Sequence, residues 1–459
     1  MKFAWIALCA ALLVGCAGAP PPPLESLLAH DAEGRVQVCA LVVDLDSGEV
    51  LLSQGAARLC RPASTMKLLT TSSVCRRALD RPFRTLVVHS GDADGQLALI
   101  GDGDPFLTVE DVQHLARTLR AQGVRSVTGP VRVVDPLCFA PRWGQGWMWD
   151  DEPSSYQPVI SGAAVDRGCV TVVVSGRGRA LAAELQPVAG ALELRVEDVG
   201  GTLRITRGRY QDAGVVTVVG ELPDGAPTER RVSVPDPARY AGHVLLAALA
   251  DAGVAVRAPG VEVVGPLEVP AGVEASRERA VADVVVETNK VSDNLGAELL
   301  LRRLARVSEL HPVELGVESE AIGKLTVAAD LEALGVDPGG FRLADGSGVS
   351  HYNLVSADLL VRVLVDMHER GGAQAELFRR SLPIAGRDGT LAKRMKGTAA
   401  EGRVFAKTGT ISAVSNLAGY VDTRSGRRLA FAVLCQNYVG AAAPWRALQD
   451  RFCAGLAGL

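Results

Sequence analysis

Ser64 and Lys67, three positions apart, are the first pair in this sequence whose residue types and spacing could carry out chemistry. On a helix, that spacing stacks the lysine ammonium over the serine hydroxyl. Serine becomes an effective nucleophile when a base removes its proton. A lysine can be that base once burial and a neighbouring positive charge, here Lys407, lower its pKa. The N–H of Ser64 at a helix start would also be available to an oxyanion.

A second polar motif, Ser292-Asp293-Asn294, lies much further along the chain. In an extended or turn segment, side chains two residues apart project the same way. Ser292 could then relay a proton between Lys67 and a leaving group, and Asn294 could hold a substrate amide and fix the position of the lysine. The motif therefore supplies the proton transfer that the first pair needs.

The third motif, Lys407-Thr408-Gly409, lies within a strand-like run. An edge strand there could pair with a substrate backbone, because Gly409 has no side chain to block the approach. Lys407, together with Thr408 and Thr410, would attract a terminal carboxylate, and the N–H of Thr410 is the candidate second oxyanion donor.

Taken singly, each motif has an ordinary structural explanation. A serine three residues before a lysine is commonly a helix cap with a surface lysine, and the other two motifs are commonly a turn and a loop. All three in this order, in matching local contexts, form the signature of class A β-lactamases and penicillin-binding proteins. The sequence therefore predicts acyl transfer through a serine ester.

The elements that would position these motifs come from both ends of the chain. Residues 36–52 alternate in polarity around a Gly-containing turn and predict a hairpin, after which a helical pattern begins near Ala63. Strands at 404–411, 415–422 and 428–436 and a helix at 445–456 follow near the other end. We expect one antiparallel sheet flanked by helices. Residues 82–270, which read as short strands with one helical patch at 240–252, would be inserted into it as β-rich modules.

Four further stretches resemble those of one family, the D-alanyl-D-alanine carboxypeptidase/endopeptidase family of low-molecular-mass class C penicillin-binding proteins (peptidase family S13). They are Gly101-Asp102-Gly103-Asp104-Pro105 with Leu107, Gly146-Trp147-Met148-Trp149-Asp150-Asp151, Asp345-Gly346-Ser347-Gly348-Val349-Ser350, and Leu382-Pro383 through Gly386-Arg387-Asp388-Gly389-Thr390-Leu391.

The resemblance implies an α+β fold: a penicillin-binding/serine β-lactamase-like transpeptidase domain that is discontinuous and carries two inserted β-rich domains. We expect the catalytic domain at 31–81 and 271–459, inserted domain II at 82–166 and 233–270, and inserted domain III at 167–232. Class A β-lactamases are similar at the active site, but their interval between the first two motifs is much shorter.

The resemblance also implies a serine-type D-Ala-D-Ala carboxypeptidase or endopeptidase that acts on peptidoglycan stem peptides or cross-links. It would be inhibited by β-lactams and would need no metal or organic cofactor. Asp151 resembles an acidic residue that contacts the amino group of the stem in relatives; a solvated acidic turn is the alternative. His351 stands where the family commonly has Arg. A β-lactamase or esterase, and a degenerate peptidoglycan-binding lipoprotein, remain as other functions.

The start of the sequence predicts export. Met1-Lys2 precedes an apolar run, and Leu13-Val14-Gly15-Cys16 resembles the lipobox of bacterial lipoproteins. We expect a signal peptide at 1–15, lipidation of Cys16, and a flexible tether at 16–30. Because residue 17 is Ala rather than Asp, the resemblance places the lipid anchor in the outer membrane, facing the periplasm.

Composition narrows the partners further. The formal net charge of −4 gives no basic footprint for nucleic acid. No cluster of Cys and His has the spacing of a metal site. An oxidising compartment would permit disulfides, but the odd number of cysteines in the mature chain leaves at least one free thiol.

Overall fold

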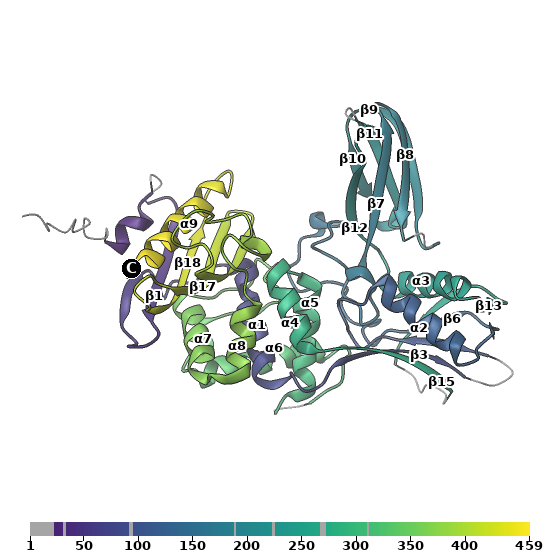
Figure 1. Cartoon of the computed structure of the whole chain (residues 1–459), viewed down its shortest axis with the longest axis horizontal. Coiled ribbons are helices and arrows are strands. Elements are labelled where there is room, and N and C mark those ends of the chain that lie inside the picture. Colours follow the sequence, from purple (N-terminus) through teal and green to yellow (C-terminus); the bar gives the residue numbers. More distant parts are fainter. Residues whose placement is uncertain are drawn as a thin grey trace, which may run out of the picture.

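The computed structural model describes residues 23–30, 34–90, 95–187, 190–222, 225–266, 272–309 and 312–459. The predicted signal peptide and the predicted lipidation site Cys16 lie outside these ranges. Strands from both ends of the chain build a five-stranded antiparallel sheet at one end of the molecule (Figure 1). Its strands, in spatial order, are β16 (Val404–Ile411), β17 (Val414–Asp422), β18 (Arg428–Gln436), β1 (Gln37–Asp44) and β2 (Val50–Gln54).

Strand β1 shows how this sheet serves two cores, because successive side chains of a strand point to opposite faces. Val38, Ala40 and Val42 join the apolar core beneath α9 (Ala443–Gly458). Cys39 and Leu41 join the core on the opposite face. β1 pairs with β18 along its whole length, which confirms the prediction that the two ends of the chain complete one sheet.

Helix α1 (Lys67–Arg77) is the centre of the layer on that opposite face, and nearly all its side chains are buried. Because α1 is surrounded by other helices and the sheet, water does not reach its side chains, and Lys67 in its first turn is buried in the protein interior. The helices around α1 are α4 (Val281–Val291), α5 (Asn294–Arg303), α6 (Ser319–Ala333), α7 (Ala357–Arg370) and α8 (Gly372–Ser381).

The last part of the predicted flexible tether is folded. Leu24–Leu28 forms a short 3-10 helix (η1) that packs on α9, and Leu28 is buried. The His30 ring lies edge-on to Trp445 at 5.3 Å. The prediction of a tether is therefore wrong for this stretch, because its leucines cover apolar surface of α9.

A second five-stranded sheet, of mixed direction, is inserted between α1 and α4 (Figure 1). Helices α2 (Val109–Ala121) and α3 (Pro237–Asp251) pack on it. α3 confirms the helical patch predicted at 240–252, whereas α2, which begins with a capping box between Thr108 and Asp111, was not predicted. The strands, in spatial order, are β14 (Val261–Val264), β6 (Val131–Val134), β4 (Leu97–Ile100), β3 (Phe83–His89) and β15 (Val273–Arg279).

Two three-stranded sheets form a further β module that projects from the second sheet (Figure 1). The predicted α+β architecture with inserted β-rich modules is confirmed. One sheet contains β12 (Thr228–Ser233), β7 (Cys169–Arg177) and β8 (Ala180–Gln186); the other contains β10 (Arg204–Arg207), β11 (Val215–Glu221) and β9 (Glu193–Thr202); and a small pair joins β5 (Ser126–Val127) to β13 (Ala255–Val256).

All seven cysteines from Cys39 onward are free thiols. No helix in the described ranges combines the length and the apolar character needed to cross a membrane. Short 3-10 helices connect several elements: η2 (Ala63–Met66), η3 (Trp149–Asp151), η4 (Asp166–Gly168), η5 (Tyr210–Asp212), η6 (Leu304–Val307), η7 (Pro338–Gly340) and η8 (Gly389–Leu391).

Replacement of Phe452 by Ala tests whether α9 stabilises the first sheet. Phe452 is fully buried in the core beneath α9. We expect Phe452→Ala to lower the free energy of unfolding by about 3–5 kcal/mol, because the truncation leaves a cavity. The neighbouring Arg451 is exposed, so Arg451→Ala should change it by less than about 0.5 kcal/mol. Equal urea midpoints for the two variants would contradict this account of the core.

Candidate active site

Ser64 lies in the 3-10 turn η2, immediately before α1. Residues from the first sheet hold the chain that enters this turn: the side-chain amide of Asn416 on β17 donates to the carbonyls of Arg61 (2.9 Å) and Pro62 (2.8 Å). Ala63 adopts the left-handed conformation with φ of 47°. A strained residue of this kind persists only where its surroundings fix it. The sheet therefore determines where the hydroxyl of Ser64 points.

Lys67 lies at the first position of α1, is fully buried, and its Nζ has three hydrogen-bond partners. Nζ lies 3.2 Å from Ser64 Oγ, 2.6 Å from Asn294 Oδ1 and 2.8 Å from the carbonyl oxygen of Ser347. As an ammonium, the group donates to all three. As a neutral amine, it can donate to Asn294 and Ser347 and accept the proton of Ser64. The structure brings together the serine and the lysine that the sequence paired.

Burial lowers the pKa of Lys67 to about 8, against the opposing influence of Asp345, Asp293 and Glu298. The charge of Lys407, which was expected to lower the pKa of Lys67, is not among the causes of this shift. Lys407 is itself fully buried, and its pKa is lowered well below the ordinary value by burial and by the charge of Lys67. Desolvation of both ammonium groups favours the neutral amines, which is the state a base requires.

Ser292 and Asn294 occupy a sharp corner between two helices. Ser292 ends α4 in the left-handed conformation (φ 63°), and Asp293 caps α5 by accepting from the N–H of Gly296 at 2.7 Å. Ser292 Oγ accepts from Lys407 Nζ at 2.9 Å, whereas Asn294 accepts from Lys67. The two side chains of the motif therefore meet different lysines, although the sequence analysis assigned both to Lys67.

Gly409 allows β16 to touch the nucleophile turn. A Cβ at Gly409 would lie 2.7 Å from the carbonyl oxygen of Pro62 and 3.1 Å from the backbone nitrogen of Ser64. The first approach is closer than real Cβ atoms tolerate and the second is tighter than most of their contacts, so the glycine is required by packing inside the protein rather than by the substrate alone. β16 is an edge strand, as predicted. Its Thr408 hydroxyl is hydrogen-bonded to that of Thr390 at 2.8 Å.

The turn after η7 aims a carbonyl at Lys67. Asp345 accepts from the N–H groups of Gly348 and Ser350, both at 2.8 Å. Glu298, buried inside α5, accepts from the N–H groups of Gly346 (3.0 Å) and Ser347 (3.1 Å).

Because these bonds fix the peptide planes, the carbonyl of Ser347 points to the amine of Lys67. Sequence reasoning missed Glu298; its one signal was a glutamate in the apolar run of α5.

A cavity of about 550 Å³ connects the first sheet domain with the insert. Asp151 lines it and accepts from the Tyr156 hydroxyl at 2.6 Å. His351 also lines it, and burial together with the charge of Arg61 lowers the pKa of its imidazole. Three residues from the predicted motifs, Ser64, Ser292 and Asn294, also line this cavity, as does Thr410 next to the third motif. The arrangement offers a hydroxyl, a buried amine beside it and backbone N–H groups, which is the equipment for acyl transfer.

Comparison with known proteins gives a consistent result. The family model described as "D-Ala-D-Ala carboxypeptidase 3 (S13) family" matches residues 23–451. A D-alanyl-D-alanine carboxypeptidase from an Actinomadura species is 34% identical, over 95% of this chain and 84% of that protein. The D-alanyl-D-alanine carboxypeptidase DacB of Haemophilus influenzae is 24% identical, over 86% of this chain and 84% of its own length.

Among solved structures, penicillin binding protein 4 (dacB) from Haemophilus influenzae superimposes with a TM-score of 0.79 at 22% identity, covering 94% of this chain and 97% of its own. A penicillin G acylated predatory endopeptidase from Bdellovibrio bacteriovorus, in complex with its immunity protein, gives a TM-score of 0.52 at 14% identity, with 91% of each chain covered. These two likenesses bear on the fold.

Replacement of Glu298 tests whether this carboxylate holds the turn at Lys67. Glu298→Ala would leave the backbone N–H groups of Gly346 and Ser347 unpaired and would remove a buried partner of Arg302. We expect a loss of about 3 kcal/mol in the free energy of unfolding, measured in urea, and a smaller loss for Glu298→Gln, which keeps an acceptor. Glu314→Ala, at an exposed carboxylate paired with Arg306, is the control. A Glu298→Ala protein as stable as this control would show that the turn holds itself.

Proposed function

Because the chain belongs to the D-Ala-D-Ala carboxypeptidase 3 (S13) family, we propose that the cavity beside Ser64 is the active site of a serine-type D-Ala-D-Ala carboxypeptidase and endopeptidase acting on peptidoglycan. One observation carries the proposal: the fully buried Nζ of Lys67 lies 3.2 Å from the Oγ of Ser64, and Ser64 lines a cavity that the insert also lines. A degenerate binding protein would have no use for a desolvated amine at this position.

In the acylation step, the neutral amine of Lys67 takes the proton of Ser64. Ser64 Oγ then attacks the carbonyl carbon of the penultimate D-Ala. The N–H groups of Ser64 and Thr410 stabilise the oxyanion, and the hydroxyls of Thr408 and Thr410 donate hydrogen bonds to the terminal carboxylate, with the buried Lys407 behind them donating to Ser292. The amide bond breaks, and the proton held by Lys67 is relayed through the hydroxyl of Ser292, which also accepts from Lys407, to the leaving amine, so that Lys67 and Ser292 return to their starting protonation states.

Deacylation completes the cycle. Water attacks the ester carbon, and the Ser64 oxygen leaves and regains its proton. When the leaving amine is free D-Ala, the reaction is that of a carboxypeptidase. When it belongs to a neighbouring stem peptide, the reaction is that of an endopeptidase. The carboxylate of Asp151, on the insert's wall of the cavity, is suited to bind a cationic amino group of the stem. β-Lactams would acylate Ser64 as analogues of the acyl donor.

We propose the domain limits expected from the sequence, 31–81 with 271–459, 82–166 with 233–270, and 167–232, with one change just after residue 270. Separate sheets support this division. Strand β15 lies beyond residue 270, yet it pairs with β3, so it is structurally continuous with the inserted sheet. The N-terminal pattern that ends in Gly15-Cys16 supports a lipoprotein anchored in the outer membrane and facing the periplasm.

The first test is acylation by benzylpenicillin, followed by the mass of the intact protein. We expect one adduct on the peptide that contains Ser64, and none on Ser64→Ala. Rapid loss of the drug without a lasting adduct would identify a β-lactamase instead. No adduct with intact drug would identify a degenerate site. A Ser64→Ala protein that still released D-Ala from a pentapeptide would refute the assignment of the nucleophile.

The pH dependence tests the role of Lys67. The neutral amine is the base, and its pKa is about 8 in the folded protein. The acylation rate should therefore rise with pH and reach half its maximum near pH 8. Lys67→Arg, which stays charged, should lower the rate by about 10²–10⁴-fold at every pH. A rate that does not change between pH 6 and pH 9 would contradict this role.

A further inference from the structure

Arg167, on the insert, lies in a left-handed turn that L residues adopt only at a cost in free energy. Three successive residues of η4 have positive φ: Asp166 (49°), Arg167 (62°) and Gly168 (64°). The turn is nevertheless well fixed. The N–H of Asp166 donates to the carbonyl of Leu107 at 2.8 Å, and Arg231 donates to the carbonyl of Asp166 at 2.6 Å. A strained backbone that is fixed by its neighbours often serves to orient a side chain, here that of Arg167.

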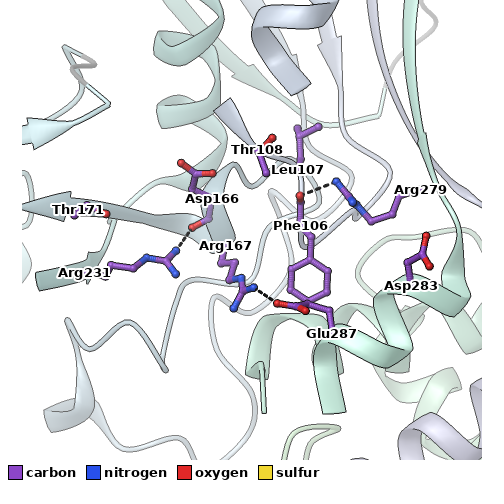
Figure 2. A pocket seen from close by; sticks show the side chains of 10 residues that line it. All are labelled: Phe106, Leu107, Thr108, Asp166, Arg167, Thr171, Arg231, Arg279, Asp283 and Glu287. Atoms are coloured by element: carbon purple, nitrogen blue, oxygen red, sulfur yellow. Dashed lines mark hydrogen bonds and ion pairs between the residues drawn. The ribbon is translucent and has the colours of Figure 1, made fainter. Parts of the chain in front are cut away.

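The guanidinium of Arg167 crosses to the catalytic domain. It lies 2.5 Å from Glu287 Oε1 on α4 and 3.4 Å from Oδ2 of Asp293, which caps α5. Figure 2 shows Arg167 extending to Glu287 beside the ring of Phe106, at the edge of a cavity of about 650 Å³. One arginine of the insert therefore contacts both helices that form the Ser292–Asn294 corner.

The ring of Phe106 packs against the guanidinium of Arg167 and also lies close to the start of α5, which forms part of the Ser292–Asn294 corner. The guanidinium carbon lies 4.8 Å from the centre of the Phe106 ring. A Cβ at Gly296, in the first turn of α5, would lie 3.2 Å from the tip of that ring. Arg279 fixes the segment that carries Phe106, by binding the Asp104 carboxylate at 2.9 Å and the Phe106 carbonyl at 2.8 Å. These contacts hold the side chain of Arg167 in one position.

We propose that Arg167 is a positioning residue for acylation, which holds the Asp293 carboxylate so that Ser292 and Asn294 face Lys407 and Lys67. The inference rests on the proposed function and adds a contribution of the insert to it. Arg167 acts through Asp293: the carboxylate both caps α5 and receives the arginine, so the guanidinium fixes the helix start that presents Asn294 to Lys67.

Arg167 also balances charge around Lys67. The carboxylates of Asp345, Asp293 and Glu298 raise the pKa of Lys67 and so oppose the effect of burial. Arg167 offsets the charge of Asp293. Its removal should raise the pKa of Lys67, and because acylation needs the neutral amine, the rise of the rate with pH should move to higher pH. Loss of a residue with only a structural role would not shift the pH range over which the acylation rate rises (the pH limb).

The experiment measures the second-order rate of acylation by benzylpenicillin from pH 6 to pH 10 in the full-length protein. For Arg167→Ala we expect a loss of about 10-fold at pH 7 and an upward shift of the pH limb by about half a unit. Arg167→Lys, which keeps a charge but not the two-pronged geometry, should keep the wild-type limb and lose less of the rate. Arg179→Ala is the matched control, since Arg179 pairs with Asp198 on the exposed part of the insert.

A second background separates positioning from general destabilisation. In Asp293→Asn, which keeps a capping acceptor, Arg167→Ala should change the acylation rate by less than about 2-fold, since the carboxylate through which Arg167 acts is already gone and only its ion pair with Glu287 remains. An unchanged rate and limb for Arg167→Ala would overturn the inference while leaving the proposed function intact. A lower melting temperature with an unchanged limb would overturn it as well. A wild-type protein that is not acylated at all would refute the proposed function itself.

Discussion

The buried amine of Lys67 is the constraint on which the rest of the structure depends. An ammonium removed from water loses far more solvation than a single contact returns, so it must be either well paired or neutral. In this protein the amine of Lys67 is both paired with oxygens and shifted toward its neutral form. Two fixed oxygens and one hydroxyl surround Nζ, while burial lowers its pKa to about 8. A site of this kind is useful only if its oxygens cannot move away.

The fold supplies that rigidity from distant parts of the sequence. Asn416 on β17 fixes the approach to Ser64, Glu298 inside α5 fixes the carbonyl of Ser347, and Gly409 on β16 allows strand and turn to touch. Each is buried or tightly packed, and each acts on a backbone group rather than on the substrate. The side chains that we propose to be catalytic are therefore placed by residues to which we assign no chemical step.

The features that could be predicted from the sequence are those with a periodic apolar pattern or a short local motif. The strands of the first sheet were placed to within a residue or two, because alternating apolar residues that serve two cores leave a clear pattern. The three motifs predicted which polar side chains meet around Ser64. The pairing of Ser292 with Lys407 and of Asn294 with Lys67 could not be predicted, because it depends on a left-handed residue between two helices. Helix α2 was missed although its capping box and its apolar residues at helical spacing are local signals. The docked η1 was missed because its leucines have meaning only against α9, far along the chain.

The long insert is best understood through the same constraint. The insert begins after α1, which carries Lys67, and ends before α4, which leads to Ser292. Along the chain it therefore separates Lys67 from the Ser292–Asn294 corner that contributes to the surroundings of Lys67. Its Tyr156 carbonyl accepts from Asn294 at 2.6 Å, and its Arg167 contacts Asp293. A domain that merely bound substrate would need contact only with the cavity. Since this insert also touches the groups that hold Asn294 against Lys67, displacement of the insert would change the chemistry as well as the affinity.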